Sequence, residues 1–162
     1  MNGLLTNALL LGLGATAFMD MVALLQKRLL GIPSLNYAMV GRWLGHLPRG
    51  RFIHRPIGES AKIQAELVLG WLAHYLIGVA FAMTFLVLVG PNWLARPSLI
   101  PALGFGVITV IAPFLVLQPG MGAGVAARKT PQPTTARLRS LFAHASFGAG
   151  LWLAGIIAMM VL

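Results

Sequence analysis

The chain has 162 residues, of which 58% are hydrophobic and only 9% are charged, and its mean hydropathy is +0.84. These values exclude an ordinary water-soluble domain and are typical of a polytopic membrane protein. The absence of cysteine excludes disulfides, zinc fingers and iron–sulfur clusters, so any metal ion would need histidine, carboxylate or carbonyl ligands. The net charge of +9 favours an anionic membrane surface over nucleic acid as the partner, because the basic residues cluster between apolar segments.

Four apolar segments of about 20 residues are each long enough to cross a bilayer as a helix. They are residues 4–26, 67–89, 99–117 and 140–162. No Lys or Arg precedes the first segment, so it lacks the basic start of a signal peptide and we expect it to be retained. The sequence therefore predicts an all-α fold in which residues 1–162 form a single bundle of four transmembrane helices.

The connections between these spans differ strongly in charge. Residues 27–66 and 118–139 together hold all but one of the 12 Lys and Arg residues, and the connection between the second and third spans holds only Arg96. Loops rich in Lys and Arg remain in the cytoplasm. We therefore expect both basic loops to be cytoplasmic and both termini to lie outside.

The first basic loop contains a stretch with helical amphipathicity, residues 34–47. Its apolar residues recur at helical spacing, Ser34 is placed to cap the N-terminus, and Arg42 and His46 mark the side expected to face water. We expect a short amphipathic helix that lies in the membrane interface.

The next stretch, RGRFIHRPIG, alternates basic and apolar residues. It is typical of an interfacial anchor, and it also suits a clamp for a lipid headgroup phosphate or another anion. The candidate residues for binding anionic lipid are Arg49, Arg51, His54 and Arg55.

Three ionisable residues lie inside the spans, Asp20, His74 and His144. They are about 9, 11 and 6 Å from the cytoplasmic ends of their helices, at a rise of about 1.5 Å per residue. Each lies on a helix face that carries small residues, along which membrane helices approach one another. We expect them to form one inward-facing polar layer, which Glu66 can join from the mouth of the second span.

Three roles are open for this layer. It can be a structural lock of interhelical hydrogen bonds, or a proton or ion relay, because imidazole titrates near neutral pH. Alternatively, His74 and His144 can bind haem or a divalent metal ion.

Two short motifs occur twice. Ala73-His74-x3-Gly78 recurs as Ala143-His144-x3-Gly148, and Gly12-Leu-Gly14 recurs as Gly104-Phe-Gly106. They suggest two related helical hairpins. We find no catalytic constellation in the sequence, which argues against an enzyme.

The ordered set GLGATAFMD, GRWLGHLPRGRFIHRPIG, GWLAHYLIGVAFA, QPGMGAGVAARKTP and HASFGAGLW resembles an uncharacterised family of small four-span bacterial inner-membrane proteins, a domain of unknown function. The resemblance covers nearly the whole chain and implies four spans in the bacterial inner membrane. In that membrane, the termini that the loop charges place outside would be periplasmic. The resemblance supplies no activity. Our leading hypothesis is an accessory or scaffold subunit that packs against other membrane proteins, and the alternatives are a small transporter or proton-conducting homo-oligomer and a haem- or metal-binding membrane protein.

Overall fold

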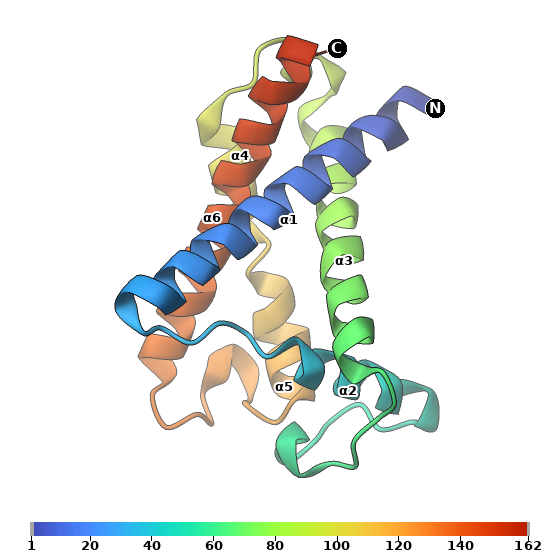
Figure 1. The fold of residues 1–162 in the computed structure, drawn as a ribbon, viewed down its shortest axis with the longest axis vertical. Coiled ribbons are helices and arrows are strands. Elements are labelled where there is room, and N and C mark those ends of the chain that lie inside the picture. Colours follow the sequence, from blue (N-terminus) through green and yellow to red (C-terminus); the bar gives the residue numbers. More distant parts are fainter. Residues whose placement is uncertain (1, 162) are drawn as a thin grey trace. The chain divides into compact units, whose positions relative to one another are not determined.

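The computed structural model describes residues 2–161, which are mostly helical and contain no strand. The helices are α1 (Asn2–Leu30), α2 (Tyr37–His46), α3 (Glu66–Val89), α4 (Leu99–Ile108), α5 (Gln118–Gly120) and α6 (Pro133–Val161) (Figure 1). Four helical segments in this part of the chain are long and apolar enough to cross a membrane: Gly3–Leu30, Glu66–Val89, Leu99–Gly120 and Pro133–Met160. The prediction of an all-α protein with four transmembrane helices and a short additional helix is therefore confirmed.

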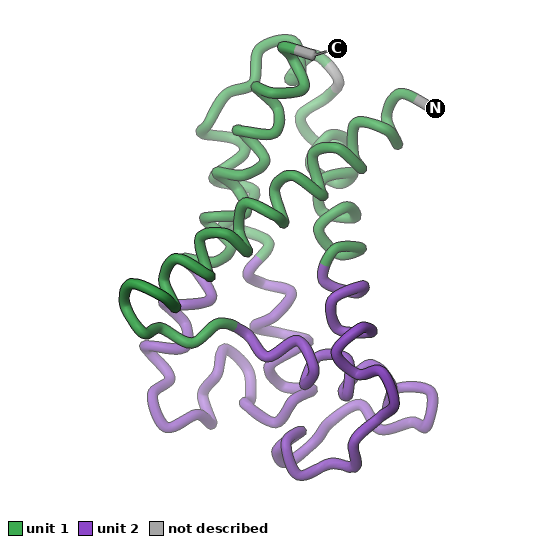
Figure 2. Tube along the Cα trace, viewed as in Figure 1, with its two compact units in different colours: residues 1–34, 75–109, 142–162 green, residues 35–74, 110–141 purple. Residues whose placement is uncertain are grey.

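The chain divides into two compact units (Figure 2). Unit 1 contains residues 1–34, 75–109 and 142–162, and unit 2 contains residues 35–74 and 110–141. Unit 1 thus holds most of the apolar helices, whereas unit 2 holds most of the two basic loops. That residues 1–162 form a single bundle stays a prediction.

Glycine allows the helices of unit 1 to pack with their backbones in contact. A Cβ atom added to Gly12 would lie 2.5 Å from Cα of Val79, and one added to Gly106 would lie 2.5 Å from Cα of Gly148. Such backbone contacts are characteristic of membrane helices that pair through small residues. The core beside them contains the T-shaped ring pair Phe85 and Trp93, with ring centroids 4.7 Å apart.

The third span is not the continuous helix that the sequence predicts over residues 99–117. The α-helix α4 ends at Ile108, a turn follows at residues 109–110, and Pro113–Leu117 forms a π-helix. The reason lies in Pro113, whose missing N–H and ring are incompatible with a helical hydrogen bond to the carbonyl of Thr109, four residues earlier. The span therefore changes its helical geometry near its middle.

In unit 2 the two basic loops are hydrogen-bonded to each other. The backbone N–H of His54 donates to the carbonyl of Gly120 (2.9 Å), and that of Ile57 donates to the carbonyl of Met121 (3.0 Å). The Trp43 indole packs so closely on Gly120 that a side chain there would clash with the ring. The two loops therefore contact each other within unit 2, and their cytoplasmic location stays a prediction.

The observed helices extend beyond the predicted spans, and the predicted cap of α2 was wrong. The side chain of Asn36, not that of Ser34, caps α2, because it accepts a hydrogen bond from the backbone N–H of Ala38 (3.1 Å). Helix α1 continues to Leu30, and α6 begins at Pro133 rather than at residue 140. Hydropathy marks only the apolar part of a helix, whereas backbone hydrogen bonds continue through polar residues beyond it.

Candidate functional site

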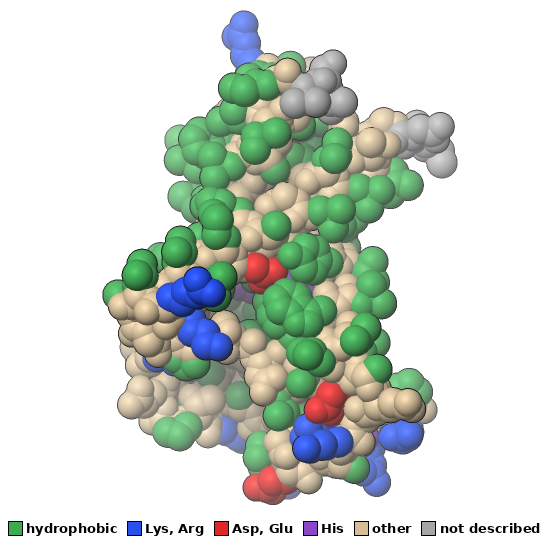
Figure 3. Space-filling model, viewed as in Figure 1, with side chains coloured by type: hydrophobic (Ala, Val, Ile, Leu, Met, Phe, Trp, Pro, Cys, Tyr) green, Lys and Arg blue, Asp and Glu red, His purple; other side chains and the backbone are tan. Residues whose placement is uncertain are grey.

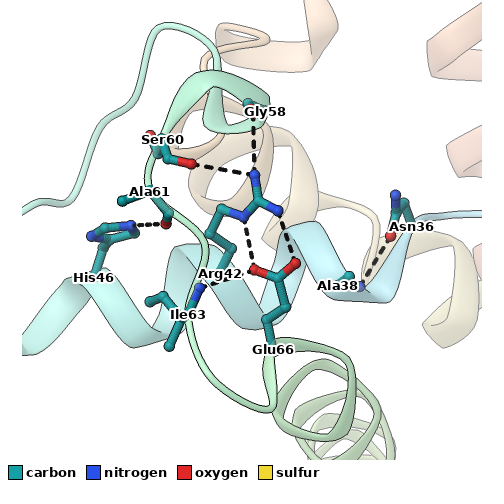
Figure 4. Close-up of polar contacts among 9 residues, drawn as sticks. All are labelled: Asn36, Ala38, Arg42, His46, Gly58, Ser60, Ala61, Ile63 and Glu66. Atoms are coloured by element: carbon teal, nitrogen blue, oxygen red, sulfur yellow. Dashed lines mark hydrogen bonds and ion pairs between the residues drawn. The ribbon is translucent and has the colours of Figure 1, made fainter.

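A buried ion pair joins α2 to the first residue of α3 within unit 2 (Figure 4). The Arg42 Nε donates to Glu66 Oε2 and its Nη2 donates to Glu66 Oε1, both at 2.8 Å. The Arg42 Nη1 also donates to the carbonyls of Gly58 (3.1 Å) and Ser60 (3.3 Å). The guanidinium therefore fixes the loop that precedes α3 as well as the helix itself.

The geometry of this pair keeps both groups charged. The hydrogen bond to Glu66 raises the pKa of Arg42 above its ordinary value, and this effect exceeds the opposing effect of burial. Glu66 Oε2 also accepts a hydrogen bond from the backbone N–H of Ile63 (3.2 Å). A paired and hydrogen-bonded carboxylate needs no proton to be stable in this position.

Two glycines let α2 approach α3 closely at this site. A side chain at Gly41 would clash with the backbone carbonyl of Glu66, and one at Gly70 would clash with that of Tyr37. Because the two backbones lie so close together, the Arg42 side chain is within hydrogen-bonding distance of Glu66.

The prediction that Arg42 and His46 mark the solvent side of the amphipathic helix was wrong. Their exposed fractions are 3% and 2%. Amphipathic spacing identifies the apolar face of α2, but residues 57–63 cover the opposite face and supply acceptors for both polar side chains. The Nε2 of His46 bonds to the carbonyl of Ala61 at 3.0 Å.

A second histidine, His54, lies beside His46. Their ring centroids are 5.1 Å apart with an interplanar angle of 54°. His54 is 6% exposed, and its Nδ1 bonds to the hydroxyl of Ser60 at 2.7 Å. His54 is therefore part of the interior of unit 2 and not of the surface that its basic neighbours suggested.

The arginines around His54 are exposed, as an interaction with anionic headgroups requires. They are Arg49, Arg51 and Arg55. Between them the apolar side chains Phe52 and Ile53 are 62% and 69% exposed. Figure 3 shows hydrophobic side chains over the visible faces of α1 and α3, and basic side chains near the C-terminal end of α1 and around the loops at the bottom of the view.

His74 is the last residue of α3 that belongs to unit 2, and aromatic side chains surround it. Its Nε2 bonds to the hydroxyl of Tyr37 at 3.0 Å, and the two ring centroids are 4.5 Å apart. Trp71 stacks on Tyr37, with centroids 4.1 Å apart, and meets the edge of His74 at 5.8 Å. Tyr37 on α2 thus connects the interfacial helix to the histidine inside α3.

His144 pairs with a hydroxyl in unit 1. Thr109 Oγ1 donates its single proton to the carbonyl of Gly106 (2.6 Å), so the Nδ1–H of His144 donates to Thr109 (2.7 Å). The hydroxyl sits where the third span changes its helical geometry.

Asp20 also has a hydroxyl partner in unit 1. The Tyr75 hydroxyl on α3 is hydrogen-bonded to the Asp20 carboxylate on α1. The pair therefore joins two transmembrane helices through a carboxylate and a neutral donor.

A model of the family described as "Protein of unknown function (DUF2938)" matches residues 9–158. The chain belongs to this family. No curated protein and no solved structure matches it significantly. The resemblance noted in the sequence is thus confirmed, and four apolar helices are a property of this DUF2938 protein.

The predicted polar layer of the DUF2938 chain consists of groups that each have their own partner. Asp20 and His144 belong to unit 1, and His74 and Glu66 belong to unit 2. Sequence reasoning missed the partners, which are Tyr37, Arg42, Tyr75 and Thr109. For Tyr75 and Thr109 the available signal was a hydroxyl within an otherwise apolar span, whereas Tyr37 and Arg42 lie in the first loop and gave no such signal. That the four residues form one functional layer stays a prediction.

Within residues 2–161, no group of three or more His, Cys, Asp or Glu side chains has the arrangement of a metal site. The hypothesis that His74 and His144 hold haem or a divalent ion stays a prediction. One ring nitrogen of each is bonded to a hydroxyl, Tyr37 for His74 and Thr109 for His144.

Proposed function

We propose that this protein is an accessory subunit of the bacterial inner membrane, held at its cytoplasmic side by a basic surface and packed against other membrane proteins through its helices. The observation that supports this function best is the pairing of the ionisable groups inside the spans. Asp20, His74 and His144 are each bonded to a hydroxyl on another segment of the chain. Such bonds stabilise helix packing, which makes the groups structural locks.

The lipid-facing surface is available for partners. In the most apolar 18-residue stretch of each of the four spans, only 22% to 39% of the residues are buried. Large apolar side chains such as Leu88 (70% exposed) and Ile100 (85% exposed) cover the remainder. The glycines Gly12, Gly78, Gly106 and Gly148 pack within the chain, so contacts with a partner would rest on these larger side chains.

The exposed basic residues of unit 2 suit an anionic bilayer surface. They are Arg49, Arg51, Arg55, Lys62, Arg128, Lys129, Arg137 and Arg139. Each Lys or Arg near an anionic membrane contributes about 1 kcal/mol of attraction. The apolar tip formed by Phe52 and Ile53 adds a hydrophobic contact to this charge.

Site-specific photo-crosslinking in native membranes tests this function. A photoreactive phenylalanine analogue is placed at three exposed positions, Leu88, Ile100 and Phe142, and at the buried Phe147 as a matched control. We expect one or two exposed positions to give a discrete adduct with the same second membrane protein, and Phe147 to give none. Adducts with lipid alone at every exposed position, or with a second copy of this chain alone, would overturn the accessory role.

A proton- or ion-conducting oligomer is the second candidate. The observation that favours it is the carboxylate of Asp20 within an apolar helix beside the Tyr75 hydroxyl, a pair that can exchange a proton. Reconstitution in liposomes with a pH-sensitive dye tests it. A pH-driven flux that Asp20→Asn abolishes would support this function, and the absence of flux in the wild-type protein would exclude it.

A further inference from the structure

The buried histidines of unit 2 contain two nitrogen atoms that the fold does not use. His46 Nδ1 and His54 Nε2 are both buried and have no hydrogen-bond partner among the described residues. An unsatisfied buried polar atom costs about 1–3 kcal/mol. The two rings are adjacent, with centroids 5.1 Å apart, which makes a ligand bound by both rings the candidate to satisfy both atoms.

The proton on His46 can be assigned from its contact. Its Nε2 lies 3.0 Å from the carbonyl of Ala61, which only accepts hydrogen bonds, so Nε2 carries the proton. The buried Nδ1 then presents a lone pair. The Ser60 hydroxyl, 2.7 Å from His54 Nδ1, can donate or accept a hydrogen bond. An ion at the buried Nε2 requires the tautomer in which the Nδ1–H of His54 donates to Ser60.

This arrangement is the one found around metal-ligating histidines. Such a histidine donates its second ring N–H to a carbonyl or a side-chain oxygen, which fixes the tautomer and the ring orientation. Ala61 and Ser60 supply these two oxygens from consecutive residues. Arg42 in turn holds that segment through the carbonyl of Ser60.

The ring separation also fits a shared ion. With metal–nitrogen bonds of about 2.0–2.1 Å, each ring centroid lies about 3.2 Å from the ion, and a tetrahedral angle places the two centroids about 5 Å apart. The centroids of His46 and His54 are 5.1 Å apart. The nearby charge of Arg42 is balanced by Glu66, so it does not oppose a cation strongly.

We propose that His46 and His54 form a binding site for one divalent transition-metal ion. Two imidazole ligands favour zinc, copper, nickel or cobalt over calcium or magnesium, which prefer oxygen ligands. Water or an external ligand completes the coordination, because the described residues place no third histidine or carboxylate in the site. The site is separate from the predicted one at His74 and His144 and independent of the accessory function.

The test is a titration of the full chain with Co²⁺ and Zn²⁺ in detergent micelles, after treatment with a chelator and purification through a tag without histidine. We expect one ion per chain and a visible Co²⁺ absorption of the kind that nitrogen ligands produce. His46→Gln retains an amide donor for Ala61, and His54→Asn retains one for Ser60, but each lacks the second ring nitrogen. Ser60→Ala should weaken binding about 10-fold and the two histidine variants more strongly.

The double variant His74→Asn/His144→Asn is the matched control, and it should bind the ion like the wild-type protein. Circular dichroism and thermal unfolding of each variant, together with Ser60→Ala, which keeps both histidines, separate loss of the ion site from loss of the fold. The proposal is overturned if the wild-type protein binds no stoichiometric ion, or if binding is lost in the control variant and kept in His46→Gln and His54→Asn.

Discussion

Arg42 on α2 and Glu66 on α3 are 24 residues apart in the chain and meet through two hydrogen bonds of 2.8 Å. The Arg42 side chain is 4% exposed and that of Glu66 is 17% exposed. Since the same guanidinium also donates to the carbonyls of Gly58 and Ser60, one side chain fixes the end of the connecting segment as well as the start of α3.

Arg42→Met should therefore lower the thermal midpoint of unfolding strongly. It leaves the Glu66 carboxylate without its counter-ion and leaves two carbonyls without a donor. Glu66→Gln should have a smaller effect, because an amide oxygen can still accept from the arginine. The double variant Arg42→Met/Glu66→Met should be more stable than Arg42→Met alone, since no charge is left unpaired. Thermal unfolding in detergent measures all three, and an Arg42→Met variant as stable as the wild-type protein would contradict this view of the site.

The backbone contact between α4 and α6 gives a second prediction. A Cβ at Gly106 would lie 2.5 Å from Cα of Gly148, so Gly106→Ala should destabilise the protein by about 1–3 kcal/mol. The matched control is Gly104→Ala, two residues earlier on the same helix, where an added Cβ meets nothing within 4 Å. The control should be neutral or slightly stabilising, because alanine favours helix. Equal unfolding midpoints for the two variants would show that α4 and α6 do not pack as described.

The four spans and the short helix after the first span could be predicted because they depend on local patterns. Apolar length identifies α1 and α3, and helical spacing of apolar residues identifies α2. The contacts of the site could not be predicted, because Arg42 meets Glu66 only when residues 57–63 fold back over α2. In the same way, hydropathy detected the third span, but its interruption depends on the position of Pro113 relative to the carbonyl of Thr109.

The recurring Ala-His-x3-Gly motif shows how much of a site a short pattern can predict. In both copies the histidine is bonded to a hydroxyl, Tyr37 for His74 and Thr109 for His144. The motif glycines, Gly78 and Gly148, are both in close contact with a neighbouring helix. The pattern therefore identified two histidines that bond a hydroxyl and two glycines at helix contacts, but the partner hydroxyls have no common sequence signal.

The pairing of Asp20 with Tyr75 gives a third prediction, which separates a structural lock from a relay. In a double-mutant cycle with Asp20→Asn and Tyr75→Phe, we expect a coupling free energy of about 0.6–2 kcal/mol, the usual range for interhelical hydrogen bonds in membranes. Chemical unfolding in mixed micelles measures it. Thr84→Val is a suitable control on the same helix, because the Thr84 hydroxyl bonds only within the helix, to the carbonyl of Ala80 (2.9 Å).

If the accessory function holds, the Asp20→Asn protein reconstituted in liposomes should show the same pH response as the wild-type protein. A coupling energy near zero would contradict the lock. A pH-driven flux present in the wild-type protein and lost in Asp20→Asn would instead support the conducting oligomer.

The absence of cysteine makes the predicted topology directly measurable, because any single cysteine introduced is the only thiol in the chain. Ile53 is 69% exposed beside the arginines of the first basic loop, and Asn92 is exposed in the connection that carries only Arg96. If both basic loops are cytoplasmic, a maleimide that cannot cross the membrane should label Asn92→Cys in intact spheroplasts. It should label Ile53→Cys only after permeabilisation.

A third single cysteine makes this test independent of the first loop. Val125 is 41% exposed in the second basic loop, which is hydrogen-bonded to the first through His54 and Gly120. Because the two loops contact each other, Val125→Cys must be labelled under the same conditions as Ile53→Cys, whichever side they occupy. Labelling of Ile53→Cys and Val125→Cys from outside would reverse the predicted orientation but keep the fold, whereas opposite labelling of the two would contradict the contact between the loops itself.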